Sequence, residues 1–233
     1  MSSKFFSIPM TVMTLIMIVI VFEFLPIDAE VQSWLFNSGS QTWMINRNDQ
    51  VLDLVFYSGI KTLFVVSILF LLFSLIFLRR FNWVKNNTKA LTIVVLSSFI
   101  VPLTVGVLKD ATNMPCPNQL IAYGGDYEHI GLFEQLTEQQ QRPATKCYPA
   151  GHASGGFSLL ALLFLVTISR SKKIVLTLVM VVGWSTAGYK MAIGDHFLGH
   201  SVVTMVLAWL IILIIVAGIN KIEAIIYNKN IHR

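Results

Sequence analysis

The amino-acid sequence predicts an all-α protein that crosses a membrane several times. Of its 233 residues, 55% are hydrophobic and 12% are charged, which is about half the charged fraction of a typical soluble domain. Six apolar stretches are each long enough to span a hydrocarbon core of about 30 Å. We expect a single membrane domain covering residues 1–233, a bundle of six transmembrane helices with these approximate limits: 5–25, 52–78, 90–108, 153–169, 174–192 and 197–219.

The first apolar stretch follows Lys4 and ends before Pro26. No small-residue cleavage site accompanies it, so we expect a helix that is retained rather than a signal peptide. The polar stretch after it, residues 28–50, carries Trp34 and Trp43. Tryptophans in such a position are typical of a segment that lies along the membrane interface, although an ordinary loop would also fit.

The second apolar stretch contains Lys61, about two turns from its beginning. A lysine inside an apolar helix is either a functional residue or one whose amine reaches back to the interface. The third stretch ends at Lys109, and a short basic turn separates the fourth stretch from the fifth. The tripeptide Gly194-Asp195-His196 connects the fifth stretch to the sixth.

Lysine and arginine are distributed unequally between the two sides of the predicted bundle. Eleven of the 17 lie on the side of both termini, and six lie on the other side. Because basic residues accumulate on the cytoplasmic side, both termini are expected there. In a bacterial inner membrane, the long polar segment 109–152 would then face the periplasm.

The two cysteines, Cys116 and Cys147, both fall in that outward segment. An oxidising compartment favours a disulfide between them. Such a bridge would stabilise the fold by about 3–4 kcal/mol in the loop-entropy description. The alternative is a pair of partly buried free thiols.

Polar residues gather at the outward ends of four predicted helices. They are Lys109, the segment 149–152, Lys190, and the pair His196 and His200. Histidines act as nucleophiles or as general acids and bases near neutral pH. Lysines and the free N–H groups of a helix beginning near Gly151 would stabilise a phosphoryl group. This set of residues indicates phosphoryl transfer through a phosphohistidine, without a metal or other cofactor.

The order of these clusters resembles the three motifs of the type 2 phosphatidic acid phosphatase (PAP2) family of membrane lipid phosphatases. The first motif is Lys, six residues, then Arg-Pro; Lys109 and Pro117 keep this spacing, with Cys116 in place of the arginine. The second motif, Pro-Ser-Gly-His, corresponds to Pro149–His152, with alanine in place of serine.

The third motif of the family is Ser-Arg, five residues, His, three residues, Asp. Tyr189 and Lys190 stand for Ser-Arg, His196 falls at the correct spacing, and His200 replaces the aspartate. The resemblance implies that His196 is the nucleophile and that His152 protonates the leaving oxygen. It also implies a phosphate cradle made of Lys109, Lys190 and the Gly151 backbone.

The departures from the motifs suggest where other residues would take over. Arg142 and Lys146 are nearby cations that would compensate for the missing arginine, and Lys61 is a further candidate for phosphate binding. His200 would orient the nucleophile by accepting a hydrogen bond from it, because the two lie one helical turn apart. The missing negative charge would come from Asp195 or Asp110.

The resemblance implies a lipid phosphate or diphosphate as substrate and gives no indication of nucleic-acid binding. Phosphatidylglycerol phosphate, undecaprenyl diphosphate, phosphatidic acid and the phosphates of lipid A all fit, and the oligomeric state stays open. A phosphotransferase would use the same residues, and a lipid-binding or transport protein could retain the same phosphate pocket. A zinc site is a further alternative, with His196 and His200 one turn apart and Asp195 or His152 completing it.

Overall fold

The computed structural model describes residues 7–134 and 143–231, and the fold is all-α as predicted. Within this part, the strands β1 (Phe36–Asn37) and β2 (Thr42–Trp43) form one short antiparallel hairpin. The helices are α1 (Ile8–Phe24), α2 (Ile27–Leu35), α3 (Gln50–Asp53), α4 (Gly59–Phe77), α5 (Asn82–Thr112), α6 (Gly151–Ser158), α7 (Ser169–Ala192) and α8 (Leu198–Ile231).

Four helical stretches in the described ranges are long and apolar enough to cross a membrane: Gln50–Phe77, Asn82–Gln119, Ser169–Ala192 and Leu198–Asn230. A fifth is reached if α1 and α2 count as one span bent by 67°. The chain is therefore a multi-pass membrane protein. Several helices also extend beyond their apolar stretches, since α5 begins at Asn82 and α8 continues to Ile231.

The fourth predicted span is shorter than expected. Helix α6 continues as a tight 3-10 helix, Leu159–Phe164, and the apolar helix Gly151–Phe164 ends before the predicted limit of residue 169. The sequence from Leu165 to Ile168 is apolar, so composition alone did not reveal where the helix ends. The expected count of six thus corresponds to four or five full-length helices and one short one.

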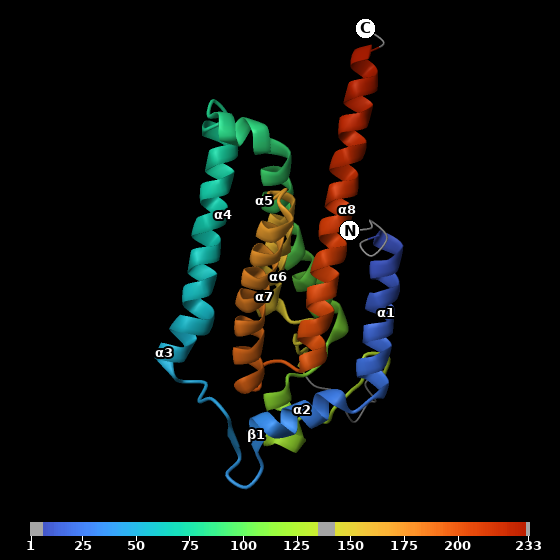
Figure 1. The fold of residues 1–233 in the computed structure, drawn as a ribbon. Coiled ribbons are helices and arrows are strands. Elements are labelled where there is room, and N and C mark those ends of the chain that lie inside the picture. Colours follow the sequence, from blue (N-terminus) through green and yellow to red (C-terminus); the bar gives the residue numbers. More distant parts are fainter. Residues whose placement is uncertain (1–6, 135–142, 232–233) are drawn as a thin grey trace.

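The short helix α6 lies at the centre of the bundle, in contact with α5, α7 and α8, while α1 and α4 stand at opposite edges (Figure 1). Helices α6 and α7 approach closely because each has a glycine where the two helices cross. A Cβ atom on Gly156 would lie only 2.8 Å from the Cα of Gly183. Phe157, which is fully buried, fills the space beside this contact.

The segment between α1 and α4 covers one end of the bundle (Figure 1). The Gln32 side-chain amide donates a hydrogen bond to the Met191 carbonyl at 3.2 Å. The Trp43 ring packs against Gly194, where a Cβ atom would come within 2.4 Å of the indole. This segment therefore forms a helix and a hairpin that pack against the connection between α7 and α8, the connection that carries His196.

Candidate active site

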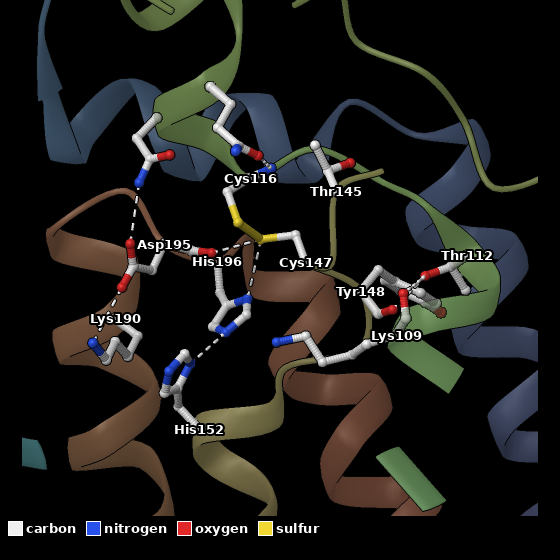
Figure 2. Close-up of a disulfide and its surroundings, with 12 residues drawn as sticks. Lys109, Thr112, Cys116, Thr145, Cys147, Tyr148, His152, Lys190, Asp195 and His196 are labelled. Atoms are coloured by element: carbon white, nitrogen blue, oxygen red, sulfur yellow. Dashed lines mark hydrogen bonds and ion pairs between the residues drawn. A yellow bond between two sulfur atoms is a disulfide. The ribbon is translucent and has the colours of Figure 1, made fainter. Parts of the chain in front are cut away.

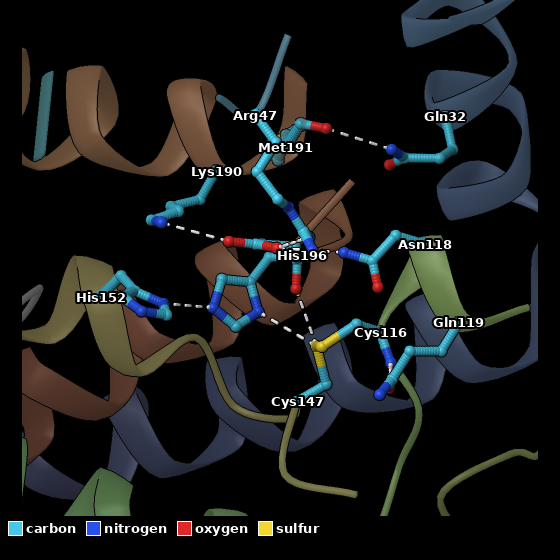
Figure 3. Close-up of polar contacts among 11 residues, drawn as sticks. Gln32, Arg47, Cys116, Asn118, Gln119, Cys147, His152, Lys190, Met191 and His196 are labelled. Carbon is cyan, nitrogen blue, oxygen red and sulfur yellow. Dashed lines mark hydrogen bonds and ion pairs between the residues drawn. A yellow bond between two sulfur atoms is a disulfide. The ribbon is translucent and has the colours of Figure 1, made fainter. Parts of the chain in front are cut away.

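Three histidines from different elements meet at this covered end of the bundle. His152 lies in the first turn of α6, His196 in the connection before α8, and His200 in the first turn of α8. The Nδ1 atom of His152 is 3.0 Å from the Nε2 atom of His196 (Figure 3). The rings of His196 and His200 are 5.8 Å apart, and both residues are only 2% exposed.

The connection that carries His196 is shaped by Gly194, whose φ of +77° lies in the left-handed region that favours glycine. After this turn, the backbone N–H groups of Asp195 and His196 donate to the Lys190 carbonyl at 2.8 and 3.3 Å. These bonds close the end of α7, and His196 is therefore held by the backbone of the same helix that carries Lys190.

Two lysines flank the histidine pair (Figure 2). The Lys109 side chain passes directly over Gly151, where a Cβ atom would lie 3.2 Å from Nζ and 3.3 Å from Cδ. Lys190 is 7% exposed, and its amine lies 3.1 Å from an Asp195 carboxylate oxygen and 4.1 Å from the centre of the Tyr57 ring. The structure thus places both predicted lysines beside His152 and His196.

A cavity of about 270 Å³ leads from Lys109, Gly151 and His152 along the side of α4. Its polar end contains Lys61, Lys109, Gly151 and His152. Its walls are mostly apolar and include Ile60, Phe64, Val65 and Pro102. We call this cavity the α4 groove; it brings Lys61 to the same site as the motif residues.

Lys146, expected to help bind the phosphate, is paired with a carboxylate in the structure. Its amine lies 2.7 Å from Asp110, and both side chains are 61% exposed. An exposed pair of this kind contributes little to stability, and the role of Lys146 in phosphate binding stays a prediction. Arg142, the other cation expected to compensate for the missing arginine, lies outside the described residues.

Asp195 is also used differently from the expectation that it would supply a negative charge to His196. Its carboxylate contacts the Lys190 amine and the Arg47 guanidinium and accepts a hydrogen bond of 3.0 Å from Asn118. Arg47 and Asn118 could not be expected at the site from the sequence, because they belong to no spaced motif. Tyr57, whose ring lies below the Lys190 amine, could not be expected at the site from the sequence either.

The predicted disulfide between Cys116 and Cys147 is confirmed, with a distance of 5.1 Å between the two Cα atoms. It joins the segment after α5 to the segment before α6 (Figure 2). The Cys147 sulfur lies 3.5 Å from the Nδ1 atom of His196. A disulfide sulfur has no hydrogen to donate, so this contact assigns the proton to Nδ1 and leaves a lone pair on Nε2.

His200 makes no hydrogen bond to His196, since Nδ1 of His196 faces Cys147 and Nε2 faces His152. The expected hydrogen bond between the two residues is therefore wrong. His200 instead bonds the backbone of Cys147. Its own Nδ1 atom is buried and has no partner among the residues that the structure describes.

Burial lowers the pKa of His196 well below its usual range, and the nearby His200, His152, Lys109 and Lys190 lower it further. His196 is consequently neutral at physiological pH. Its Nε2 lone pair is available for attack on an electrophile.

The positions of the histidine and cysteine side chains give limited support to a zinc site. Within residues 7–134 and 143–231, the one group of potential ligands consists of Cys147, His196 and His200, with ligand atoms within 4.8 Å of one another. However, the Cys147 sulfur is part of the disulfide, and metals bind the thiolate form of cysteine. The donor set therefore does not fit a metal ion while the disulfide is intact.

Comparison with known proteins gives one match. A family model described as the PAP2 superfamily matches residues 88–223, a range that contains all the site residues named above from Lys109 to His200. Searches of curated proteins and of solved structures find no match.

Proposed function

The chain belongs to the PAP2 superfamily, a family of phosphatases, and we propose that it removes phosphate from a membrane lipid through a phosphohistidine. The observation that carries this proposal is the contact of 3.0 Å between His152 and the lone-pair nitrogen of His196, with lysines on either side. A nucleophile, an acid and cations in one buried place are what metal-free phosphoryl transfer requires.

In the first step, Nε2 of His196 attacks phosphorus, and a P–N bond forms as the bond from phosphorus to the lipid oxygen breaks. His152 gives a proton to that oxygen, which leaves as the lipid alcohol; with a diphosphate, the terminal phosphorus is attacked and the lipid monophosphate leaves instead. His152 must carry protons on both ring nitrogens to do so, and the negative charge of the bound phosphate favours that state. The phosphoryl group has to enter between the two rings, so their direct contact would be lost on binding.

In the second step, water attacks phosphorus while neutral His152 accepts its proton. The P–N bond breaks, inorganic phosphate leaves and His196 returns to its starting state. Lys109, Lys190 and the first N–H groups of α6 would stabilise the negative charge on the phosphoryl oxygens in both steps. Asp195 holds Lys190 in place without facing the nucleophile.

The α4 groove supports a lipid as the substrate. Its apolar walls would hold a hydrocarbon chain, while the phosphate reaches Lys61, Lys109 and His152 at its polar end. Tyr57 and Lys61 precede the range matched by the family model. For this reason we propose that the segment before residue 88 belongs to the same functional unit, a single membrane domain.

The excess of basic residues on the side of the termini supports an active site on the periplasmic face of a bacterial inner membrane. Phosphate release tests the proposal, measured on the purified protein in detergent with phosphatidylglycerol phosphate, undecaprenyl diphosphate, phosphatidic acid and lipid A. We expect release from at least one of them, unaffected by a chelator and absent in His196→Ala. Transfer of the phosphate to a second lipid would identify a phosphotransferase, and binding without release would identify a non-catalytic protein.

A further inference from the structure

A second cavity, of about 340 Å³, lies on the other side of His200, at the bend between α1 and α2. It shares no lining residue with the α4 groove, and its volume is at the lower end for small-molecule sites. The proposed phosphatase mechanism gives it no role. Its polar lining consists of Glu23, Asp28, His129, Tyr148 and His200.

His200 indicates what this cavity would bind. One ring nitrogen of His200 bonds the backbone of Cys147. Because the Cys147 N–H donates to the Met114 carbonyl, the group that bonds His200 is the Cys147 carbonyl, and this nitrogen carries the proton. Nδ1 is then a hydrogen-bond acceptor, and it is without a partner in the described part of the chain although the residue is 2% exposed. A buried acceptor left unpaired is costly, so a hydrogen-bond donor in the cavity would stabilise it.

The two carboxylates of the lining are also acceptors, and one of them is fixed by a hydrogen bond. The Asp28 carboxylate accepts a hydrogen bond of 2.7 Å from the Gly199 backbone N–H, at the beginning of α8. The Glu23 carboxylate rests against Gly131, where a Cβ atom would meet it at 2.4 Å. No lysine or arginine of the described residues lines the cavity to balance them.

The Tyr148 phenol lies close to both carboxylates. Burial raises the pKa of the Tyr148 phenol, and the nearby charges of Glu23 and Asp28 raise it further. The rings of Phe22, Tyr148 and Phe197 complete the lining, and aromatic faces attract cations.

We propose that this cavity binds a primary ammonium group, such as the ethanolamine headgroup of a phospholipid or a free amine. A primary ammonium has three N–H donors for Glu23, Asp28 and Nδ1 of His200, and a positive charge for the carboxylates and rings. A quaternary ammonium such as choline has the charge but no N–H donor, so it would leave the His200 acceptor unpaired. The apolar end of α1, from Val19 to Leu25, also lines the cavity, which favours a lipid as the source.

Lipid retention by the purified full-length chain tests the site. Native mass spectrometry in detergent would compare phosphatidylethanolamine with phosphatidylcholine of identical acyl chains. We expect phosphatidylethanolamine to bind about ten- to a hundredfold more tightly, as hydrogen bonds to charged groups allow. Equal retention of the two lipids would overturn the proposal, and this comparison needs no variant that could misfold.

The variant Glu23→Gln should remove most of that preference, because the amide is neutral and keeps the size of the side chain. Its matched control is Glu30→Gln, an exposed carboxylate on α2 outside the cavity, which should retain the preference. An unchanged preference in Glu23→Gln would contradict the assignment. Competition by soluble ethanolamine would indicate a free amine as ligand, whereas competition by glycerophosphoethanolamine alone would indicate the lipid headgroup. Phosphate release plays no part in these measurements, so they stand whether or not the proposed activity is found.

Discussion

The Nδ1 atom of His196 faces the sulfur of Cys147 at 3.5 Å, while His200, which stands at the aspartate position of the third motif, bonds neither ring nitrogen of His196. The sulfur fixes the ring orientation but carries no negative charge to stabilise the cation that forms on phosphorylation. Because Cys147 is held by Cys116, the orientation of the proposed nucleophile depends on the disulfide.

Removing the disulfide should affect both stability and activity. The double variant Cys116→Ser/Cys147→Ser opens a loop of 31 residues and is expected to lose roughly 3 kcal/mol of stability by the loop-entropy description. Phosphate release should fall as well, since His196 loses the neighbour that orients it. Denaturation in detergent and phosphate assays would measure these effects, and wild-type activity in the variant would show that the sulfur has no positioning role.

A methyl group at Gly151 should displace Lys109. The Cβ atom of Gly151→Ala would lie 3.2 Å from the Lys109 amine, so the lysine must move away from the phosphate position. We expect about a tenfold loss in kcat/KM, comparable to one charge-assisted hydrogen bond. The control is Gly106→Ala, on the same helix as Lys109, where an added Cβ meets nothing within 4 Å. Equal activity in the two variants would remove Lys109 from the cradle.

The pKa of His196 has consequences for the pH dependence of activity. Burial lowers this pKa well below 6.5, so the nucleophile stays neutral in mildly acidic solution. After correction for the ionisation of the substrate, kcat/KM should show no loss at pH 6.5 from protonation of His196, and its acid limb should lie lower. A break at pH 6.5 that coincides with protonation of the His196 imidazole in an NMR titration of the resting protein would contradict this expectation.

The lowered pKa of His196 should also make the free energy of unfolding depend on pH. Between pH 6.5 and the lower pKa of folded His196, the unfolded chain binds a proton that the folded chain does not. Stability should therefore fall as the pH falls below 6.5, and His196→Gln should reduce that dependence. Denaturation midpoints of the wild type and of His196→Gln at pH 7.5 and pH 5.5 would measure this dependence. An equal change in midpoint for the two proteins would contradict the expectation.

The sidedness of the site can be tested by cysteine labelling in spheroplasts. Asp126→Cys should react with a membrane-impermeant maleimide, whereas Asn86→Cys, near the beginning of α5 at the other end of the bundle, should be protected. Both positions are exposed in the fold. The reverse pattern would place the site in the cytoplasm.

The parts of the site that could be predicted from the sequence are those with fixed spacing to a helix end. Lys109, His152, Lys190 and His196 all meet because each follows or begins an apolar stretch. The disulfide could be predicted because both cysteines fall in one outward segment. In these cases, the position of each residue along the sequence was sufficient to predict the contact.

Contacts between distant segments could not be predicted in the same way. Arg47 reaches Asp195 across 148 residues, and no periodicity signals such a pair. Lys146 was assigned to the phosphate because of its charge, but the exposed Asp110 is its partner. The cavity behind His200 depends on the 67° bend between α1 and α2, which hydropathy does not reveal.

His152 and His196 are expected to have different roles, as the general acid and as the nucleophile. His152→Ala should lose about 10²–10⁴-fold in turnover of a lipid substrate, the usual contribution of general acid catalysis. The loss should be smaller for an activated ester such as p-nitrophenyl phosphate, whose leaving group needs no proton. An equal loss for both substrates would show that His152 is not the acid.

A covalent intermediate on His196 would be detected by rapid-quench labelling with a phosphorus-32 substrate. The wild type and His152→Ala, given an activated ester, should both accumulate an acid-labile, base-stable phosphoprotein, and His196→Ala should show none. A labelled His196→Ala protein, or a labelled wild type whose phosphate maps to His152, would contradict the assignment of His196 as the nucleophile.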